Sequence, residues 1–233
     1  MNTESIADIQ ELSETVSRGP GQCTFSEGVI LAADPHGARA EALRSLRTQL
    51  MERHLRLGRR AIALCSPGAG AGTSFMAANL AVAFARAGAN TLLIDANMRD
   101  PAVQDFIVPA QPVAGLAQCL AGNGNCADFI QGNAVPNLSI LYSGGPDAAA
   151  LDRLSGPSFP ALMARCMRDF DLVIADTPPA NRHADVLRIA AAAGHALLVL
   201  RKHVSFMADA DMLIGQLAAS RAGVAGIVLN EGP

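Results

Sequence analysis

Residues 65–75 read CSPGAGAGTSF, and the interpretation of the rest of the chain depends on this stretch. It follows the apolar run AIAL and precedes an alanine-rich segment, so it predicts a strand, a glycine-rich turn and a helix in succession. Glycines let backbone N–H groups approach phosphate oxygens, and a helix start adds a favourable dipole. A phosphate-binding loop of this kind normally carries a lysine, but Thr73 stands at that position, between Gly72 and Ser74. The stretch alone leaves two interpretations open: a nucleotide loop without its cation, or a structural or dinucleotide-binding turn.

Short apolar runs alternate with helical segments along the chain, which is typical of a parallel sheet covered by helices on both faces. The expected strands are 61–65, 91–94, 138–141, 172–175, 196–200 and 226–229. The expected helices are 74–87, 115–121, 158–168, 184–193 and 208–222. The sequence therefore predicts an α/β fold with a doubly wound, mostly parallel sheet of roughly six to eight strands.

The N-terminal part of the chain has a different character. Residues 1–25 are rich in Ser, Glu, Thr and Gly and predict a flexible tail. Residues 26–58 predict a helical arm outside the core, with a helix over 38–55 that places Leu43, Leu46 and Leu50 on one side. No internal repeat divides residues 59–233, which we expect to form one domain.

Composition excludes several classes of protein. The net charge is only -3 and the 18 basic residues are scattered, so no nucleic-acid partner is expected. No apolar stretch reaches the roughly 18 residues that span a bilayer, and the first residues do not resemble a signal peptide. We therefore expect a cytoplasmic protein without direct membrane insertion.

The cysteines give no sign of a zinc site or a disulfide framework, because they are odd in number and form no CxxC pair. They are Cys23, Cys65, Cys119, Cys126 and Cys166. We expect all of them to be reduced thiols, mostly in the core.

Two expected strands end in an aspartate: Asp95 closes TLLID and Asp176 closes DLVIAD. Ligands of an open parallel sheet bind beyond the carboxyl ends of its strands. One such aspartate alone is usually a cap or turn residue, but two of them with the Ser74 hydroxyl form an oxygen-only set that suits Mg²⁺. A rival interpretation, an NAD(P)-binding oxidoreductase of Rossmann type, would use Asp95 to hold a ribose. The GxGxxG spacing fails there, and Asp176 would have no role.

Five segments in the same order resemble the bacterial tyrosine kinases of polysaccharide export, the CpsD/CapB-like proteins related to MinD and ParA ATPases. The segments are ADPHGARAEALRSLRTQL, SPGAGAGTSFMAANLAVAFARAG, TLLIDANMRDP, FDLVIADTPP and GIVLN, and the resemblance covers about residues 32–230. It implies a P-loop NTPase fold of the MinD/ParA type with an N-terminal helical arm.

The resemblance also implies roles for individual residues. Ser74, Asp95 and Asp176 would hold the Mg²⁺ of ATP or ADP, and Asp95, Asp176 and Arg99 would be catalytic. The nucleotide would be bound by Gly68, Ala69, Gly70, Ala71, Gly72, Thr73, Ser74 and Phe75, with Asn230 near the adenine. Glu41, Arg44 and Arg47 match the Glu-x-x-Arg-x-x-Arg motif through which family members self-associate, so a homo-oligomer is implied. The alternative for these three is a solvated charged face with a weak ion pair.

The chain departs from the family pattern at two positions of the expected site. Thr73 replaces the phosphate-binding lysine, and Asn97 replaces the second aspartate of the strand end. A lost charge-assisted hydrogen bond costs about 1.5 to 3 kcal/mol, or on the order of tenfold to a hundredfold in affinity. A donor lost from the transition state costs about a hundredfold to a thousandfold in rate. We therefore expect weak or conditional binding of the Mg-nucleotide and a kinase activity that is feeble or absent.

The family's tyrosine-rich tail is missing from this sequence, whose only tyrosine is Tyr142. The implied function is that of a cytoplasmic component of exopolysaccharide or capsule polymerisation and export. It would sit at the inner face of the cell membrane through a partner, a membrane-embedded chain-length determinant (co-polymerase). The alternative within the same family is an active ATPase or protein-tyrosine kinase that acts on a partner.

Overall fold

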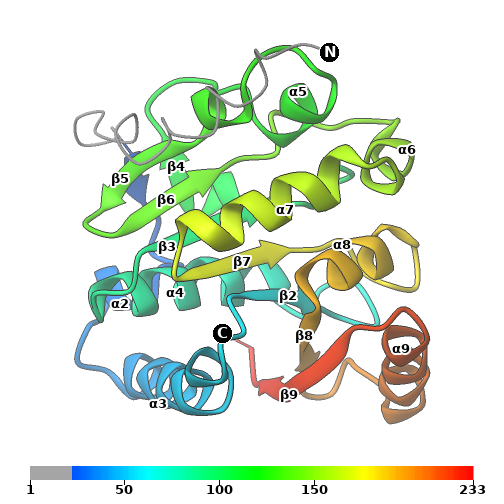
Figure 1. The fold of residues 1–233 in the computed structure, drawn as a ribbon. Coiled ribbons are helices and arrows are strands. Elements are labelled where there is room, and N and C mark those ends of the chain that lie inside the picture. The colour runs from blue at the N-terminus through cyan, green and yellow to red at the C-terminus, as the bar shows by residue number, and fades with distance from the viewer. Residues whose placement is uncertain (1–22, 233) are drawn as a thin grey trace.

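A computed structural model describes residues 23–232, and its centre is a seven-stranded sheet (Figure 1). The strand order is β5-β6-β3-β7-β2-β8-β9, and every neighbouring pair is parallel except β5 and β6. The strands are β2 (Ala61–Cys65), β3 (Thr91–Asp95), β5 (Gln131–Val135), β6 (Leu138–Leu141), β7 (Leu172–Asp176), β8 (His195–Arg201) and β9 (Gly223–Asn230). The predicted mostly parallel α/β sheet is confirmed.

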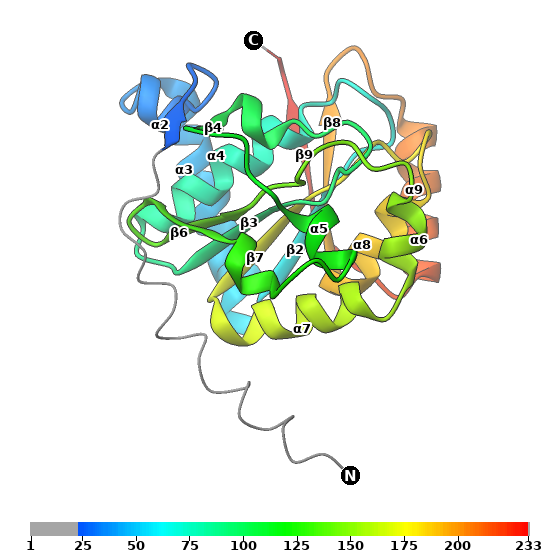
Figure 2. The ribbon, with the colours of Figure 1, turned by 90° about the horizontal axis from the view of Figure 1, so that it is seen from above.

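Helices cover both faces of this sheet (Figures 1 and 2). On one face lie α2 (Ile30–Ala33), α3 (Ala38–Arg53) and α4 (Thr73–Arg86); the other carries α5 (Leu116–Leu120), α6 (Ala150–Ser155), α7 (Ser158–Asp169), α8 (Asp185–Ala193) and α9 (Met207–Ala219). Successive residues of a strand point to opposite faces, so Ile62 packs with α4 whereas Ala63 packs with α8. A strand buried on both sides reads as an unbroken apolar run, which is why the sequence revealed β2.

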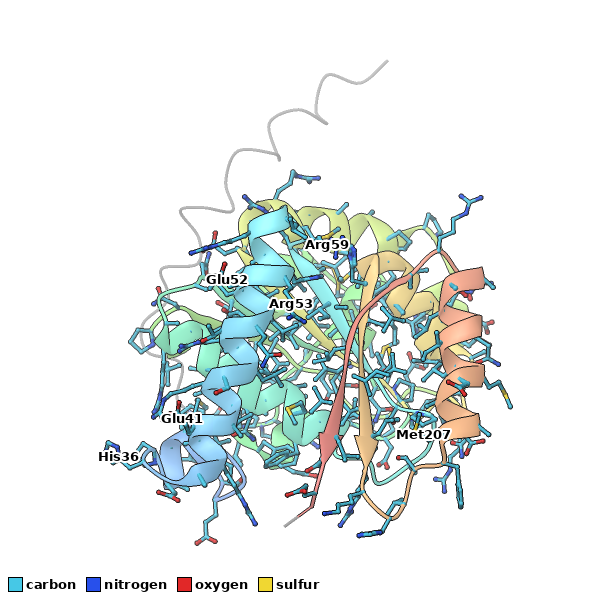
Figure 3. The ribbon with its side chains drawn as sticks, turned by 90° about the horizontal axis from the view of Figure 1, so that it is seen from below. His36, Glu41, Glu52, Arg53, Arg59 and Met207 are labelled. Atoms are coloured by element: carbon cyan, nitrogen blue, oxygen red, sulfur yellow. A yellow bond between two sulfur atoms is a disulfide. The ribbon has the colours of Figure 1, made fainter. Side chains whose placement is uncertain are left out.

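The predicted arm is part of the core. Leu43 and Leu50 of α3 are buried in the same cluster as α4, and Leu46 packs against it. Asn79 of α4 has no exposed surface; its Oδ1 accepts a hydrogen bond from Ile30 N at 2.8 Å, and its Nδ2 donates to Gly28 O at 2.8 Å. Figure 3 shows α3 at one side of β9 and β8, opposite α9. The segment before β2 is thus fastened to the sheet through α4.

The sequence did not reveal the short elements at the margins. The predicted tail lies outside the described residues up to residue 22, but Cys23–Phe25 form β1, which pairs antiparallel with β4 (Ile107–Pro109). The edge strand β5 reads QGNAV and lacks an apolar pattern. The described part of the chain also contains three short 3₁₀ turns: η3 (Leu55–Leu57), η4 (Val103–Asp105) and η5 (Cys126–Phe129). Within residues 23–232, no helix combines the length and apolarity needed to cross a membrane.

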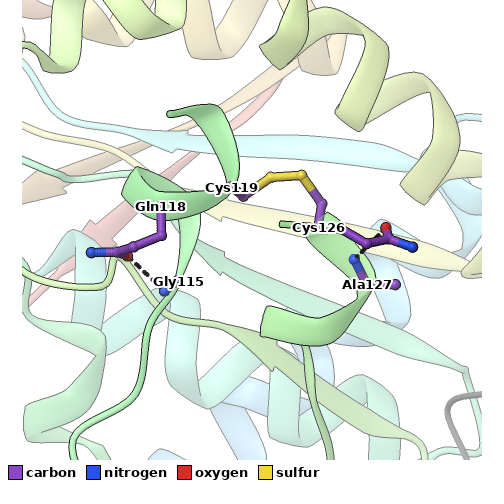
Figure 4. Close-up of a disulfide and its surroundings, with 6 residues drawn as sticks. Gly115, Gln118, Cys119, Cys126 and Ala127 are labelled. Carbon is purple, nitrogen blue, oxygen red and sulfur yellow. Dashed lines mark hydrogen bonds between the residues drawn. A yellow bond between two sulfur atoms is a disulfide. The ribbon is translucent and has the colours of Figure 1, made fainter. Parts of the chain in front are cut away.

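The prediction that all five cysteines are reduced thiols was wrong for one pair. Cys119 of α5 and Cys126 of η5 form a disulfide, with Cα atoms 4.9 Å apart (Figure 4). Gln118 holds α5 beside it, because its Oε1 accepts a hydrogen bond from Gly115 N at 2.8 Å. The turn between α5 and η5 brings the two sulfurs together, and a separation of seven residues carries no sequence signal for such a contact. Cys23, Cys65 and Cys166 are free.

Candidate functional site

The glycine-rich loop lies between β2 and α4, at the carboxyl end of the sheet. Gly70 and Gly72 have φ angles of +76° and +88°, in the left-handed region that favours glycine. A Cβ atom on Gly72 would clash with Nδ2 of Asn230. Because α4 begins at Thr73, directly after Gly72, the positive end of the helix dipole faces the loop.

Two other segments hold the loop in place. The segment after β7 lies on it, with Ala180 N donating to Ser66 O at 2.9 Å and Asn181 N donating to Pro67 O at 3.0 Å. At the end of β9, Asn230 Nδ2 donates to Ala71 O at 3.0 Å. Asn230, expected near the adenine, therefore touches the loop itself.

The structure brings Ser74, Asp95 and Asp176 together. Strands β3 and β7 are neighbours, and Asp95 is aligned with Asp176 across them. The Ser74 hydroxyl donates to Asp176 Oδ2 at 2.5 Å. Asp95 Oδ2 accepts a hydrogen bond from Val103 N at 3.1 Å. Residues far apart in the sequence thus place three oxygen-bearing side chains at one rim of the sheet.

Both carboxyl groups are poorly solvated. Burial raises the pKa of Asp176 to about 7, against the opposing hydrogen bond from Ser74. Burial and then the negative charge of Asp176 raise the pKa of Asp95 well above its ordinary value. The Oδ1 atoms of both residues are buried, and neither has a hydrogen-bond partner among the described residues.

Two unpartnered buried carboxylate oxygens beside a hydroxyl fit a hard divalent cation such as Mg²⁺, which binds through few protein oxygens and keeps several waters. Among residues 23–232, no group of three His, Cys, Asp or Glu side chains forms a metal cluster. A cation here would rely on two carboxylates and one hydroxyl.

Thr73 and Asn97, the two residues that depart from the family pattern, both form hydrogen bonds with nearby residues. Thr73 Oγ1 donates to Ser66 Oγ at 3.1 Å, so the threonine side chain links the two ends of the loop. Asn97 Nδ2 donates to Asp100 O at 2.6 Å, and Asn97 Oδ1 accepts from Asp100 N at 3.2 Å. Asn97 therefore closes a turn after β3, and neither side chain brings a charge to the site.

Two predicted site residues are engaged elsewhere. Arg99 Nε forms an ion pair with Asp185 Oδ2 at 2.9 Å, at the start of α8. Phe75 stacks edge-on against Phe106 with ring centroids 6.1 Å apart, on the side of α4 that joins the core. Phe75 therefore contributes to packing, and Arg99 attaches the start of α8.

In the described part of the chain, the hydrogen bonds of Glu41, Arg44 and Arg47 in α3 do not involve the glycine-rich loop. Arg44 pairs with Glu41 at 3.2 Å and also donates to the Pro35 carbonyl. Arg47 Nη2 reaches Thr48 Oγ1 at 3.5 Å. Figure 3 labels Glu41 near the start of α3, where its side chain is exposed.

One residue at the loop escaped the sequence reasoning. Arg201 ends β8, the strand next to β2, and its Nη1 donates to Gly70 O at 3.1 Å. Its sequence signal is its place at the carboxyl end of an apolar strand, which is also where Asp95 and Asp176 lie.

Two pockets lie away from the glycine-rich loop. One of about 300 Å³ lies beside Tyr142, and one of about 350 Å³ lies beside Phe170.

The sequence of this chain is similar to those of several known bacterial proteins. A putative tyrosine-protein kinase EpsB of Ralstonia solanacearum is 35% identical over 222 residues, which is 94% of this chain and 30% of EpsB. A putative tyrosine-protein kinase CapB of Staphylococcus aureus is 26% identical over 199 residues, 85% of this chain and 87% of CapB. Both relatives are named as putative tyrosine-protein kinases of bacteria. The chain spans about 30% of the length of the EpsB relatives, and no family model matches it.

Solved structures agree with the fold. The chimerical protein CapA2B2 matches with a TM-score of 0.78 and 26% identity, covering 89% of this chain and 91% of that protein. The septum site-determining protein MinD of Pyrococcus horikoshii, solved with Mg-ADP, matches with a TM-score of 0.63 and 22% identity, over 73% of this chain and 70% of MinD. The predicted P-loop NTPase fold of MinD type is confirmed.

Proposed function

We propose that this chain is a bacterial tyrosine-kinase-like component of exopolysaccharide or capsule polymerisation, which binds a Mg-nucleotide weakly or conditionally and has little or no kinase activity. The observation that carries the proposal is the meeting of Ser74 with Asp176, beside Asp95 and below the glycine-rich loop. The similarity to proteins named as putative tyrosine-protein kinases supports the choice of nucleotide.

Each part of the site has a task in this proposal. The loop amides and the start of α4 would bind phosphate oxygens. Ser74, Asp95 and Asp176 would hold Mg²⁺, which neutralises charge on the phosphates. Cation binding would also satisfy the unpartnered carboxylate oxygens and favour their ionised form. Thr73 adds no charge, so phosphoryl transfer loses a stabilising contact in its transition state.

The decisive experiment is a calorimetric titration of the purified chain with Mg-ATP, Mg-ADP and NAD. We expect weak binding of both adenine nucleotides, no binding of NAD, and loss of the Mg²⁺ dependence in Asp95→Asn. Binding of NAD in preference to ATP would favour a Rossmann oxidoreductase instead.

A parallel turnover assay with labelled ATP separates the binding protein from an active kinase. Turnover that matches a family member with an intact loop lysine would contradict the impaired-activity part of the proposal. Thr73→Lys should raise nucleotide affinity by about tenfold to a hundredfold, because it restores a charge-assisted hydrogen bond.

Self-association through α3 is a second part of the proposal. Among the described residues, the Arg47 guanidinium makes only a long contact to Thr48, so we propose that its charge is available to another copy of the chain. We expect Arg47→Glu to lower the mass measured by light scattering. Arg53→Glu is the matched control, because Arg53 lies at the far end of the same helix. If Arg47→Glu has the same mass as the wild type, self-association through this part of α3 is contradicted.

The third part concerns location and partner. We propose that the chain acts in the cytoplasm, at the inner face of the membrane, bound to a membrane-embedded chain-length determinant. Co-purification with the cytoplasmic segment of such a determinant, with and without Mg-ATP, tests this. A protein that regulates its partner should bind more tightly in one nucleotide state than in the other; the absence of any complex would contradict the partner assignment.

A further inference from the structure

The guanidinium of Arg201 lies at the glycine-rich loop, although the residue is 131 positions away from Gly70 in the sequence. Strand β8 runs parallel to β2, so its carboxyl end lies beside the loop that follows β2. The backbone of Arg201 is fixed by a hydrogen bond from its N to Ser205 Oγ at 2.9 Å. A Cβ added to Gly232 would lie 3.2 Å from Nη2, so Gly232 packs against the guanidinium.

The charge of Arg201 is available. Within residues 23–232, the ion pairs use Arg44, Arg56, Arg99, Arg153 and Lys202, and none includes Arg201. Its neighbour Lys202 is engaged with Glu231 at 3.2 Å. A guanidinium carries five N–H donors, and the Gly70 carbonyl uses one of them. The others retain the planar fork that binds phosphate oxygens in pairs.

The loop itself needs a cation. It is built to receive phosphate, yet Thr73 is neutral and turned toward Ser66. The nearby carboxyl groups of Asp95 and Asp176 add negative potential to the same rim. Arg99 is held by Asp185 and cannot compensate without breaking that pair.

We propose that Arg201, at the end of β8, is the phosphate-binding cation of this site. It takes the role of the lysine that a phosphate-binding loop normally carries at the position of Thr73. Its ligand is the phosphate chain of a nucleoside di- or triphosphate, not the base. The guanidinium contacts the loop at the Gly70 carbonyl, whereas a lysine at position 73 would extend from the first residue of α4. This inference rests on the nucleotide binding proposed above.

The test is calorimetric titration with Mg-ADP, Mg-ATP and adenosine. We expect Arg201→Ala to weaken binding of both nucleotides by about tenfold to a hundredfold, as for a lost charge-assisted hydrogen bond. Arg201→Lys should retain part of the affinity. Lys202→Ala, the matched control, should stay within about twofold because Lys202 is already paired with Glu231. Any adenosine binding should be unchanged in all variants.

A second background separates phosphate binding from support of the loop backbone. If Arg201 replaces the lysine, Thr73→Lys should restore most of the affinity lost in Arg201→Ala. An equal loss in both backgrounds would show that Arg201 only holds the Gly70 carbonyl, and would overturn the inference. Thermal melts check folding, and Arg201→Gln replaces Arg201→Ala if the alanine variant does not fold.

The outcomes for the two proposals are distinguishable. Nucleotide binding by the wild type that Arg201→Ala leaves unchanged overturns the role of Arg201 and keeps the proposed function. A wild type that binds neither nucleotide overturns both.

Discussion

Replacing Asp176 by Asn should stabilise the protein at pH 8. Burial raises the pKa of Asp176 from 3.8 to about 7, so the folded state holds this proton more tightly than the unfolded state does. A carboxyl group of this kind favours folding below its unfolded pKa, and that advantage is lost as the pH rises through its folded pKa. Each pKa unit is worth about 1.4 kcal/mol, so ionised Asp176 costs on the order of 4 kcal/mol at pH 8.

The amide removes this ionisation cost but remains a buried polar group, so we expect a net gain of about 2 to 4 kcal/mol. For a chain of this size that corresponds to a rise in Tm of about 5 to 15 °C. The assay is urea and thermal unfolding in EDTA at several pH values. The advantage of Asp176→Asn should shrink as the pH falls from 8 toward 4.

Asp211→Asn is the matched control, because Asp211 is exposed in the middle of α9 and its replacement should change little. A variant at position 176 that is no more stable than the wild type at pH 8, or whose advantage does not depend on pH, would refute the reasoning. Added Mg²⁺ should stabilise the wild type and not the variant if the carboxylates bind the ion.

Three further perturbations, the last with a comparison variant, test other parts of the molecule. Burial lowers the pKa of His54 to about 4, so its contribution to stability is lost as the pH falls from about 6.5 toward 4, and denaturation of His54→Gln should depend less on pH in that window. Cys119→Ser should lower the unfolding free energy by about 2 to 3 kcal/mol, and a reductant should do the same to the wild type; an unchanged melt with reductant would rule out the bond to Cys126. Gly72→Ala should cost about 1 to 2 kcal/mol and abolish nucleotide binding, because of its positive φ. Gly215→Ala, inside α9 with open space around it, should instead stabilise by about 0.5 to 1 kcal/mol, and the opposite signs distinguish a loop constraint from a general glycine effect.

The central sheet was predictable because its inner strands are buried on both faces. Such strands are mainly apolar: β2 is apolar throughout, and β7 is apolar up to its final aspartate. In β3 the apolar run lies between Thr91 and Asp95, and in β6 Ser139 interrupts it. The marginal strands β1, β4 and β5 were not predictable, since three residues or a polar sequence carry no periodicity. Their pairing is decided by tertiary contacts, as when Tyr142 Oη donates to Ile107 O at 2.9 Å.

The parts of the site that follow from strand order along one edge of the sheet were predictable. The parts that depend on contacts between distant side chains were not. Asp95 and Asp176 follow from the rule that strand ends meet at one rim, and the structure aligns them. The partner of Arg99 is Asp185, a residue that no local pattern connects to it. The contact of Arg201 with Gly70 depends on which strand lies beside β2, and the strand order is a property of the whole fold.

The amide of Asn79 bears on how the protein can be dissected. A shortened chain that begins at residue 59, where the sequence alone suggests a boundary, would leave this amide in α4 without its partners at Gly28 and Ile30. Each lost partner of a buried polar group costs about 1 to 3 kcal/mol, and the apolar surface under α3 would meet water as well. Since α4 starts at the glycine loop, the damage would reach the helix that presents Ser74. Truncation studies of this protein should therefore keep the residues from 23 onward.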